Sequence, residues 1–359
     1  MLHRKISGQV LLLLCVFIFT SSPAQAQGRL PNVMILATGG GTIAGTGATS
    51  TTTVGYTAAT VGVERLIAAV PELKKVADVK GEQVFQIASE NMSNDYWLKL
   101  AKRVNTLLAQ KDVDGIVITH GTDTIEETAY FLNLVVKSRK PVVIVGAMRP
   151  STALSADGPI NLYNAVVLAG SREAVGKGVL VALNDQINAA REVTKTNTST
   201  LDTFKTPELG LLGYMQDNKP IFYRQSTRKH TADTEFDVMH LDLLPQVDIV
   251  YGYANVNRIA VDAFMAAGAK GIIYAGVGDG SLAAPVKSAL VEARKQGAVI
   301  VRSSRVGQGI VARNGEVNDD EFGFVVSDTL NPQKARILLM LALTKTINTK
   351  DIQRIFYAY

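Results

Sequence analysis

Short runs of Val, Ile and Leu alternate along the chain with apolar residues at helical spacing. The runs lack the polar alternation of half-exposed strands, so they predict strands buried on both faces at residues 33–37, 84–87, 115–119, 142–146 and 179–183. Helical spacing between and after them predicts helices at residues 63–70, 94–110, 126–136 and 161–169. Buried strands joined by crossover helices are typical of a parallel sheet.

A second, shorter series of the same kind follows a polar stretch. It predicts strands at residues 247–251, 271–275 and 299–302 and helices at 260–267, 285–296 and 332–346. We therefore expect the α/β class, with two doubly wound, largely parallel domains. The larger N-terminal domain covers residues 27–215, a linker covers 216–239, and the smaller C-terminal domain covers 240–359.

The first 26 residues have the three parts of a secretory signal peptide. Arg4 and Lys5 precede an apolar run over residues 10–19, and Ala24-Gln25-Ala26 supplies a small-x-small cleavage site. We expect cleavage to leave Gln27 as the first residue of a periplasmic protein with no membrane segment.

Composition then excludes several kinds of protein. The 359-residue chain carries 37 Lys and Arg against 32 Asp and Glu, and removal of the signal peptide leaves a formal charge of about +3, which is too mild to indicate nucleic-acid binding. Its one cysteine, Cys15, lies in the predicted signal peptide, so disulfides, thiolate catalysis and cysteine metal sites are excluded from the mature chain.

Two glycine- and threonine-rich loops follow predicted strands, where open parallel sheets bind ligands. The first spans residues 38–45 and reads TGGGTIAG, and the second spans 119–124 and reads THGTDT. A dinucleotide site is excluded because a threonine-rich loop, rather than a helix, follows the first glycines, and the next acidic residue is the helical Glu64. The chain has no phosphate loop, zinc helix or G-x-S-x-G turn.

The remaining candidates for a nucleophile are hydroxyl groups. The glycines around Thr42 and Thr122 would allow close approach of a small substrate. A partly buried Lys195 beside Asp123 could accept the Thr122 proton, which would form a Thr-Lys-Asp relay. We expect His120 to be a structural hydrogen-bonding residue and not a base, and we expect neither a metal nor a cofactor.

Together these segments resemble the bacterial type II asparaginases and glutaminase-asparaginases, a family of secreted amidohydrolases. The similarity covers the mature chain and is carried by the two loops and by the segments VGAMRPST (145–152), SADGP (155–159), VTKTN (193–197), RSSR (302–305) and LNPQKAR (330–336). The resemblance implies hydrolysis of L-glutamine and L-asparagine through a threonine acyl-enzyme. It also implies a homotetramer built from two intimate dimers.

The resemblance also implies a role for each site residue. Thr42 would be the nucleophile under a loop that carries Tyr56, and Thr122, Asp123 and Lys195 would activate the attacking group. The substrate would be bound by the N-terminal residues Ser89, Glu90, Gly121, Thr122, Asp123 and Ala147, and by Ser281 and Glu316 of a neighbouring subunit.

Two residues depart from the family pattern. The usual loop reads TGGTIA, whereas Gly41 is an additional glycine directly before Thr42, which could displace the nucleophile. Asp279 stands where many relatives have an amide, and its charge would alter the local field.

Specificity is the least determined property. Glu90 and Ser281 match relatives that accept glutamine well, which favours dual glutaminase-asparaginase activity over strict asparagine specificity. A periplasmic amino-acid-binding protein without turnover is the alternative from a different class, and an inactive relative is a third hypothesis that rests only on Gly41.

Overall fold

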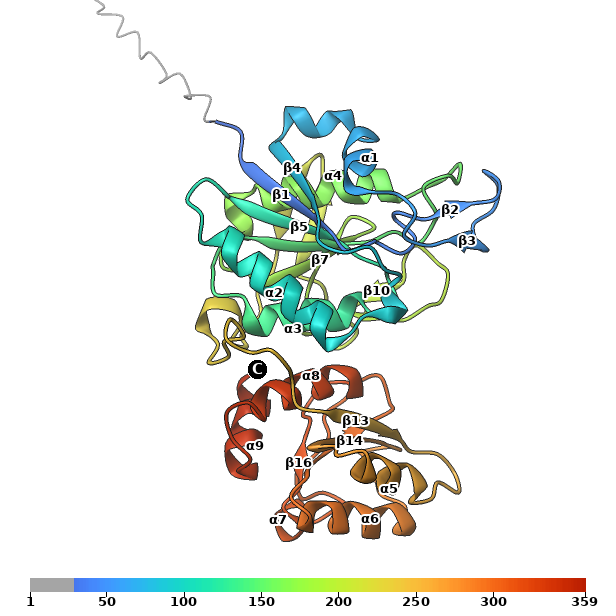
Figure 1. The fold of residues 1–359 in the computed structure, drawn as a ribbon, viewed down its shortest axis with the longest axis vertical. Coiled ribbons are helices and arrows are strands. Elements are labelled where there is room, and N and C mark those ends of the chain that lie inside the picture. The colour runs from blue at the N-terminus through green and yellow to red at the C-terminus, as the bar shows by residue number, and fades with distance from the viewer. Residues whose placement is uncertain (1–28) are drawn as a thin grey trace, which may run out of the picture. The chain divides into compact units, whose positions relative to one another are not determined.

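Five parallel strands and three antiparallel ones form the first sheet of the computed structural model, which describes residues 29–359 (Figure 1). The predicted signal peptide lies outside the described residues. The sheet order is β12-β11-β8-β7-β6-β5-β1-β4. The parallel strands are β1 (Asn32–Ala37), β4 (Asp78–Gln83), β5 (Gly115–Thr119), β6 (Val142–Val145) and β7 (Val179–Leu183). The antiparallel strands are β8 (Gln186–Ala189), β11 (Gly213–Gln216) and β12 (Lys219–Phe222).

Helices cover both faces of this sheet because consecutive residues of the central strands are apolar and point to opposite faces. Leu36 of β1 packs with α2 (Asn94–Leu108) and α3 (Ile125–Val135), whereas Ile35 packs with α1 (Val63–Ala68) and α4 (Gly158–Ala169). The central strands are therefore buried on both sides, as their unbroken Val, Ile and Leu runs predict.

The second sheet has four parallel strands, in the order β13-β14-β15-β16. They are β13 (Val247–Tyr251), β14 (Gly271–Gly276), β15 (Val299–Ser304) and β16 (Val325–Val326). The helices of this part are α5 (Ile259–Ala266), α6 (Ala284–Lys295), α7 (Asp319–Phe322), α8 (Pro332–Ala342) and α9 (Thr349–Ala358). The two α/β sheets confirm the predicted fold class.

One hydrophobic core joins the two sheets. Helix α8 packs against strands β13, β14 and β15 and also against α3, so residues of both sheets share one buried apolar cluster. Residues Pro31–Tyr359 consequently form one compact unit.

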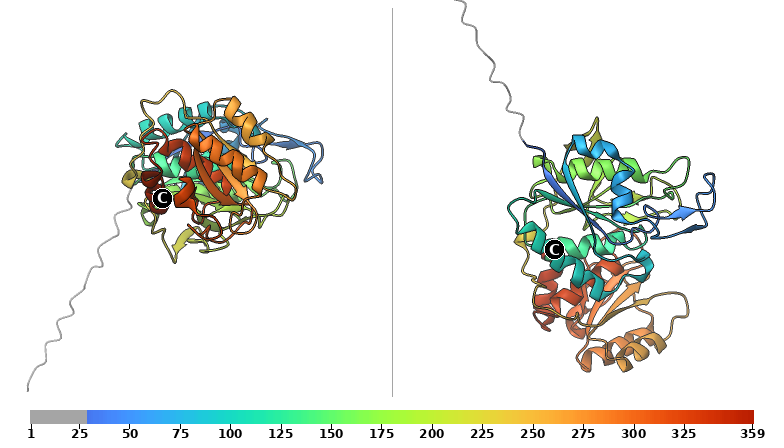
Figure 2. Two further views of the ribbon diagram at one scale, coloured as in Figure 1. Left: turned by 90° about the horizontal axis from the view of Figure 1, so that it is seen from below. Right: turned by 45° about the horizontal axis from the view of Figure 1, so that its top comes forward.

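Two short strand pairs lie outside the main sheets and carry residues of the site. The hairpin of β2 (Thr46–Gly47) and β3 (Tyr56–Thr57) extends beyond the first sheet (Figure 2). The other pair is β9 (Thr194–Lys195) with β10 (Phe204–Lys205).

The predicted strand at residues 84–87 is wrong, because the strand is the preceding segment, β4. β4 lies at the sheet edge and pairs only with β1, so its partly exposed sequence DVKGEQ needs no apolar run. Val84 and Phe85 are buried directly after it. The range predicted as a linker contains β12, which belongs to the first sheet. The predicted final helix ends early, at Ala342, and α9 follows it.

The second sheet encloses a buried ion pair. Arg302 of β15 donates to both carboxylate oxygens of Asp319 at 2.6 and 2.7 Å, and both side chains are 0% exposed. The guanidinium also donates to the backbone carbonyls of Asp279, Gly280 and Ala312.

None of the helices within residues 29–359 has the length and apolar character to cross a membrane.

We predict that Asp319→Asn lowers the free energy of unfolding by about 3–5 kcal/mol, because it leaves the Arg302 charge buried and unpaired. Urea denaturation at fixed protein concentration measures the change. The matched control is Asp262→Asn, which breaks the exposed Arg258 pair and should barely change the midpoint. Equal midpoints for the two variants would contradict this account of the pair.

Candidate active site

Two glycine turns meet at the carboxyl ends of the adjacent strands β1 and β5. Gly39, Gly40 and Gly41 have φ angles of +107°, +70° and +44°, a left-handed conformation that glycine adopts without a steric penalty. A Cβ on Gly41 would lie 2.7 Å from the Cα of Gly121. The two loops therefore touch through their backbones, and the additional glycine is accommodated in this left-handed turn.

The Thr42 hydroxyl emerges from the first turn and pairs with a phenol. Thr42 is 4% exposed, and its Oγ1 lies 2.5 Å from the hydroxyl oxygen of Tyr56. The β2–β3 hairpin returns Tyr56 over the turn, where its ring packs against Gly45. The structure thus brings together the predicted nucleophile and the predicted loop tyrosine.

A second hydroxyl group lies in the turn after β5. Lys195 Nζ donates to Thr122 Oγ1 at 2.9 Å and to Asp123 Oδ1 at 2.7 Å. Thr122 is buried, the Lys195 side chain is 17% exposed and that of Asp123 is 59% exposed. The three side chains expected to form a relay are therefore in contact, with the ammonium between hydroxyl and carboxylate.

The predicted substrate-binding residues of the first sheet surround this turn. Ser89 is buried and packs against Gly121, where a Cβ would lie 2.4 Å from Ser89 Oγ. Glu90 follows it and is exposed, and Ala147 is buried directly after β6. These residues come from the loops that follow β4, β5 and β6.

Ser281 and Glu316 lie elsewhere, beyond the second sheet. Their side chains are hydrogen-bonded to each other, and within residues 29–359 neither forms a hydrogen bond or ion pair with Thr42, Thr122 or Lys195. Asp279 lies nearby and accepts a hydrogen bond from the backbone N–H of Ala312 at 2.8 Å. The single chain consequently does not place these residues with the others.

The two turns also present unused hydrogen-bond donors. Within the described part of the chain, no backbone or side-chain acceptor bonds the N–H groups of Gly41, Thr42, Gly121 and Thr122. Backbone N–H groups of this kind can stabilise negative charge that develops on a substrate oxygen.

A buried carboxylate that the sequence pattern did not reveal supports Lys195 from behind. Glu126 accepts hydrogen bonds from Thr194 Oγ1 at 3.0 Å and from Asn331 Nδ2 at 3.0 Å, and its carboxylate lies 3.8 Å from Lys334 Nζ. Burial lowers the pKa of Lys334 to about 8. One signal in the sequence could have revealed Glu126. It is a charged residue three and four positions before Ala129 and Tyr130, on the helix face that is buried.

Lys334 also holds the backbone that leads to Lys195. Its Nζ donates to the carbonyl of Arg191 at 2.9 Å and to the carbonyl of Val193. Because Lys334 belongs to α8, a helix of the C-terminal part fixes a residue of the N-terminal site.

His120 is a buried structural residue, as its position at a strand end indicated. Its Nδ1 bonds the carbonyl of Gly121 at 2.7 Å, and its Nε2 bonds Thr128 Oγ1 at 2.9 Å. Trp97 Nε1 donates to the same Thr128 oxygen at 2.8 Å. This pattern assigns the proton to Nδ1 and leaves no ring nitrogen for the substrate.

No group of three or more His, Cys, Asp and Glu side chains among residues 29–359 is arranged to hold a metal ion.

Comparison with known proteins shows which family the chain is similar to. The family described as "Asparaginase, N-terminal" matches residues 32–228, and "Glutaminase/Asparaginase C-terminal domain" matches residues 246–356. The chain is 57% identical over 340 residues to L-asparaginase 2 of Bacillus subtilis, covering 95% of this chain and 90% of that protein. It is 54% identical over 350 residues to a glutaminase-asparaginase of Pseudomonas fluorescens biotype A, covering 97% and 96%. A protein of Haemophilus influenzae named "Probable L-asparaginase periplasmic" is 52% identical over 327 residues, covering 91% and 93%.

We predict that His120 makes stability depend on pH below neutrality. Burial lowers its pKa from 6.5 to about 4, so the unfolded chain binds this proton more readily than the folded chain. The contribution, about 3 kcal/mol, is complete above pH 6.5 and is lost progressively as the pH falls toward 4.

Urea denaturation of the parent and His120→Gln between pH 4 and 7 checks this prediction. The variant should be less stable at pH 7 and lose less stability on acidification. Replacement of the exposed His240 by Gln is the control. Parallel pH profiles for parent and His120→Gln would contradict the assignment.

Proposed function

The chain belongs to the asparaginase family, and from this premise we propose that it hydrolyses the side-chain amides of L-glutamine and L-asparagine to the corresponding acids and ammonia. The observation that carries the proposal is the convergence of two hydroxyl groups on the Gly41–Gly121 contact. Thr42 is paired with Tyr56, and Thr122 is paired with Lys195. A protein that only binds amino acids has no need of two such pairs.

In the first half-reaction, Thr42 Oγ1 attacks the amide carbon. The Thr42 proton leaves by way of the hydrogen-bonded Tyr56 hydroxyl, and the free N–H groups of the turns stabilise the oxyanion. The C–N bond then breaks, the nitrogen takes the proton that left Thr42 and departs as ammonia, and an ester with Thr42 remains.

In the second half-reaction, water attacks the ester. Thr122 and Lys195 hold and polarise this water, and Asp123 keeps Lys195 in place. The C–O bond to Thr42 breaks, the acid is released, and the Thr42 oxygen takes a proton from the attacking water. The protein groups and this water balance both steps, so the proposed reaction uses neither a metal nor a cofactor.

The substrate's α-amino and α-carboxylate groups are assigned to Ser89, Glu90 and Asp123, with the backbone of Gly121 and Ala147 lining the pocket. Dual specificity is supported by Glu90 and Ser281, the pair found in relatives that accept glutamine well. A preference for asparagine is the second candidate, supported by the 57% identity to an L-asparaginase 2. Asn and Gln differ by one methylene, worth about 1–3 kcal/mol in a pocket.

An intimate dimer is the proposed working unit, with Ser281 and Glu316 supplied by the neighbouring subunit. Its support is that these two side chains bond each other and, within residues 29–359, form no hydrogen bond with Thr42 or Thr122. We also propose pairing of dimers into a homotetramer and secretion to the periplasm. The H. influenzae relative has a periplasmic name, and the N-terminal sequence resembles a signal peptide.

We predict that Thr42→Ala abolishes ammonia release while substrate binding survives, because the ester cannot form without the hydroxyl. The assay uses residues 27–359 with L-Gln and L-Asn separately and with a chelator present. Thr106→Ala, an exposed helical threonine, is the matched control and should retain full turnover. Undiminished turnover in Thr42→Ala would refute the assigned nucleophile, and ligand binding without turnover in the parent would favour a binding protein.

We predict that Gly41→Ala lowers kcat/KM on the order of 100-fold, because its Cβ would collide with Gly121 and displace Thr42. Gly268→Ala is the control, since Gly268 has φ +89° but a Cβ added there would meet nothing within 4 Å. That variant shares the backbone strain without the collision and should keep its activity. If Gly41→Ala and Gly268→Ala had equal activities, contact between the two turns would not be what positions Thr42.

A further inference from the structure

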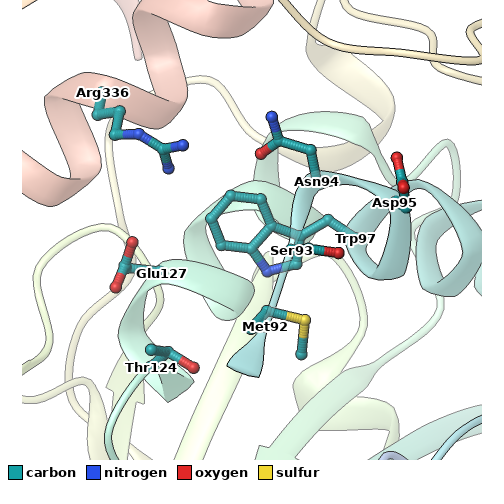
Figure 3. Close-up of a pocket in the computed structure, with 8 residues that line it drawn as sticks. All are labelled: Met92, Ser93, Asn94, Asp95, Trp97, Thr124, Glu127 and Arg336. Carbon is teal, nitrogen blue, oxygen red and sulfur yellow. The ribbon is translucent and has the colours of Figure 1, made fainter. Parts of the chain in front are cut away.

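A pocket with a volume of about 450 Å³ lies next to the proposed site, between α2, α3 and α8 (Figure 3). Its walls include Met92, Trp97, Thr124, Glu127 and Arg336. The volume is within the range of pockets that bind small organic molecules. None of these five residues has a role in the proposed reaction.

Two opposite charges face this pocket without pairing. Arg336 uses Nε to donate to the carbonyl of Val247 at 2.8 Å, and its guanidinium lies 6.0 Å from the centre of the Trp97 ring. Within residues 29–359, nothing forms a hydrogen bond or ion pair with its terminal nitrogens or with the Glu127 carboxyl group. Figure 3 shows the two side chains on different helices, on the same side of the Trp97 ring.

The ionisation of Glu127 depends on its neighbours. Burial is the main cause that raises the pKa of this carboxyl group to about 7, with Arg336 and Lys334 of α8 lowering the pKa and Glu126 contributing to the rise. Asp95 of α2 also lines the pocket. An ammonium group that binds here would favour the ionised form of Glu127.

A guanidinium and a carboxyl group that line one pocket without an ion pair suit a molecule that carries both a carboxylate and an ammonium group. We propose that the pocket binds a free zwitterionic α-amino acid, with its carboxylate on Arg336, its ammonium on Glu127 and its side chain against Trp97 and Met92. Carboxylate recognition suits the two free terminal nitrogens of an arginine. The indole and thioether provide an apolar wall for an aliphatic side chain.

An occupant would touch two hydrogen-bond chains that lead to the proposed site. The Thr124 hydroxyl donates to the carbonyl of Ser89 at 2.8 Å. The chain from Trp97 through Thr128 and His120 ends at the carbonyl of Gly121. Amino-acid binding is therefore expected to change the KM for the amide substrate, because both chains end at substrate-binding residues.

Tryptophan fluorescence tests the proposal directly, since Trp97 is the only tryptophan in the sequence. The ligand tested is L-norleucine, which has an aliphatic side chain and no amide to hydrolyse. We expect a saturable change in emission as norleucine binds. The Kd should be lower at pH 8 than at pH 6, because the ammonium group requires ionised Glu127. N-acetyl-norleucine, which lacks the ammonium, and norleucinol, which lacks the carboxylate, should bind at least roughly tenfold more weakly.

Pocket variants separate this site from the substrate site. Arg336→Met and Glu127→Gln should each raise the norleucine Kd at least roughly tenfold. Arg65→Met, an exposed arginine of α1, is the charge-matched control and should leave the Kd unchanged. Ammonia release without norleucine verifies that each variant is folded, and it tests the proposed function independently.

Either of two results would overturn the proposal. One is the absence of a saturable emission change, together with no binding of labelled norleucine in equilibrium dialysis. The other is a Kd that is the same in the parent, Arg336→Met and Glu127→Gln, which would place the amino acid elsewhere.

Discussion

The proposed site depends most on the contacts of the buried Glu126 carboxylate. It is buried where three distant parts of the chain meet: helix α3, the strand that carries Lys195, and the start of helix α8. Removing a carboxylate from water is costly, and here the cost is offset by three hydrogen bonds and the nearby Lys334 ammonium. The same contacts fix the Lys195 segment. The packing of the two sheets therefore also determines the position of the proposed relay.

The two glycine turns solve a complementary problem. Neighbouring parallel strands end at the same edge of the sheet, which brings Thr42 and Thr122 near each other only if their turns can approach closely. Glycine at positions 41 and 121 allows that approach, and it leaves backbone N–H groups free for a developing negative charge. The additional glycine of the first turn is therefore compatible with the proposed chemistry.

Sequence patterns predicted the interior of the fold better than its edges. β5, β6 and β7 are buried on both faces, so their apolar runs predicted them correctly. The edge strand β4 is polar, and the apolar pattern wrongly placed a strand after it, at residues 84–87. The Thr122, Asp123 and Lys195 contact was anticipated from polar residues after strands. The sequence did not predict the partners of Glu126 or the shared pocket of Glu127 and Arg336. These residues are far apart in the sequence, and only tertiary packing brings them together.

The central claim is that Thr42 becomes esterified while the Thr122 group serves the attacking water. Rapid quenching in acid during turnover of L-glutamine, followed by peptide mass spectrometry, tests it most directly. The account predicts a glutamyl ester on the peptide that contains Thr42. An ester on Thr122, or turnover with no covalent adduct at any quench time, would contradict it.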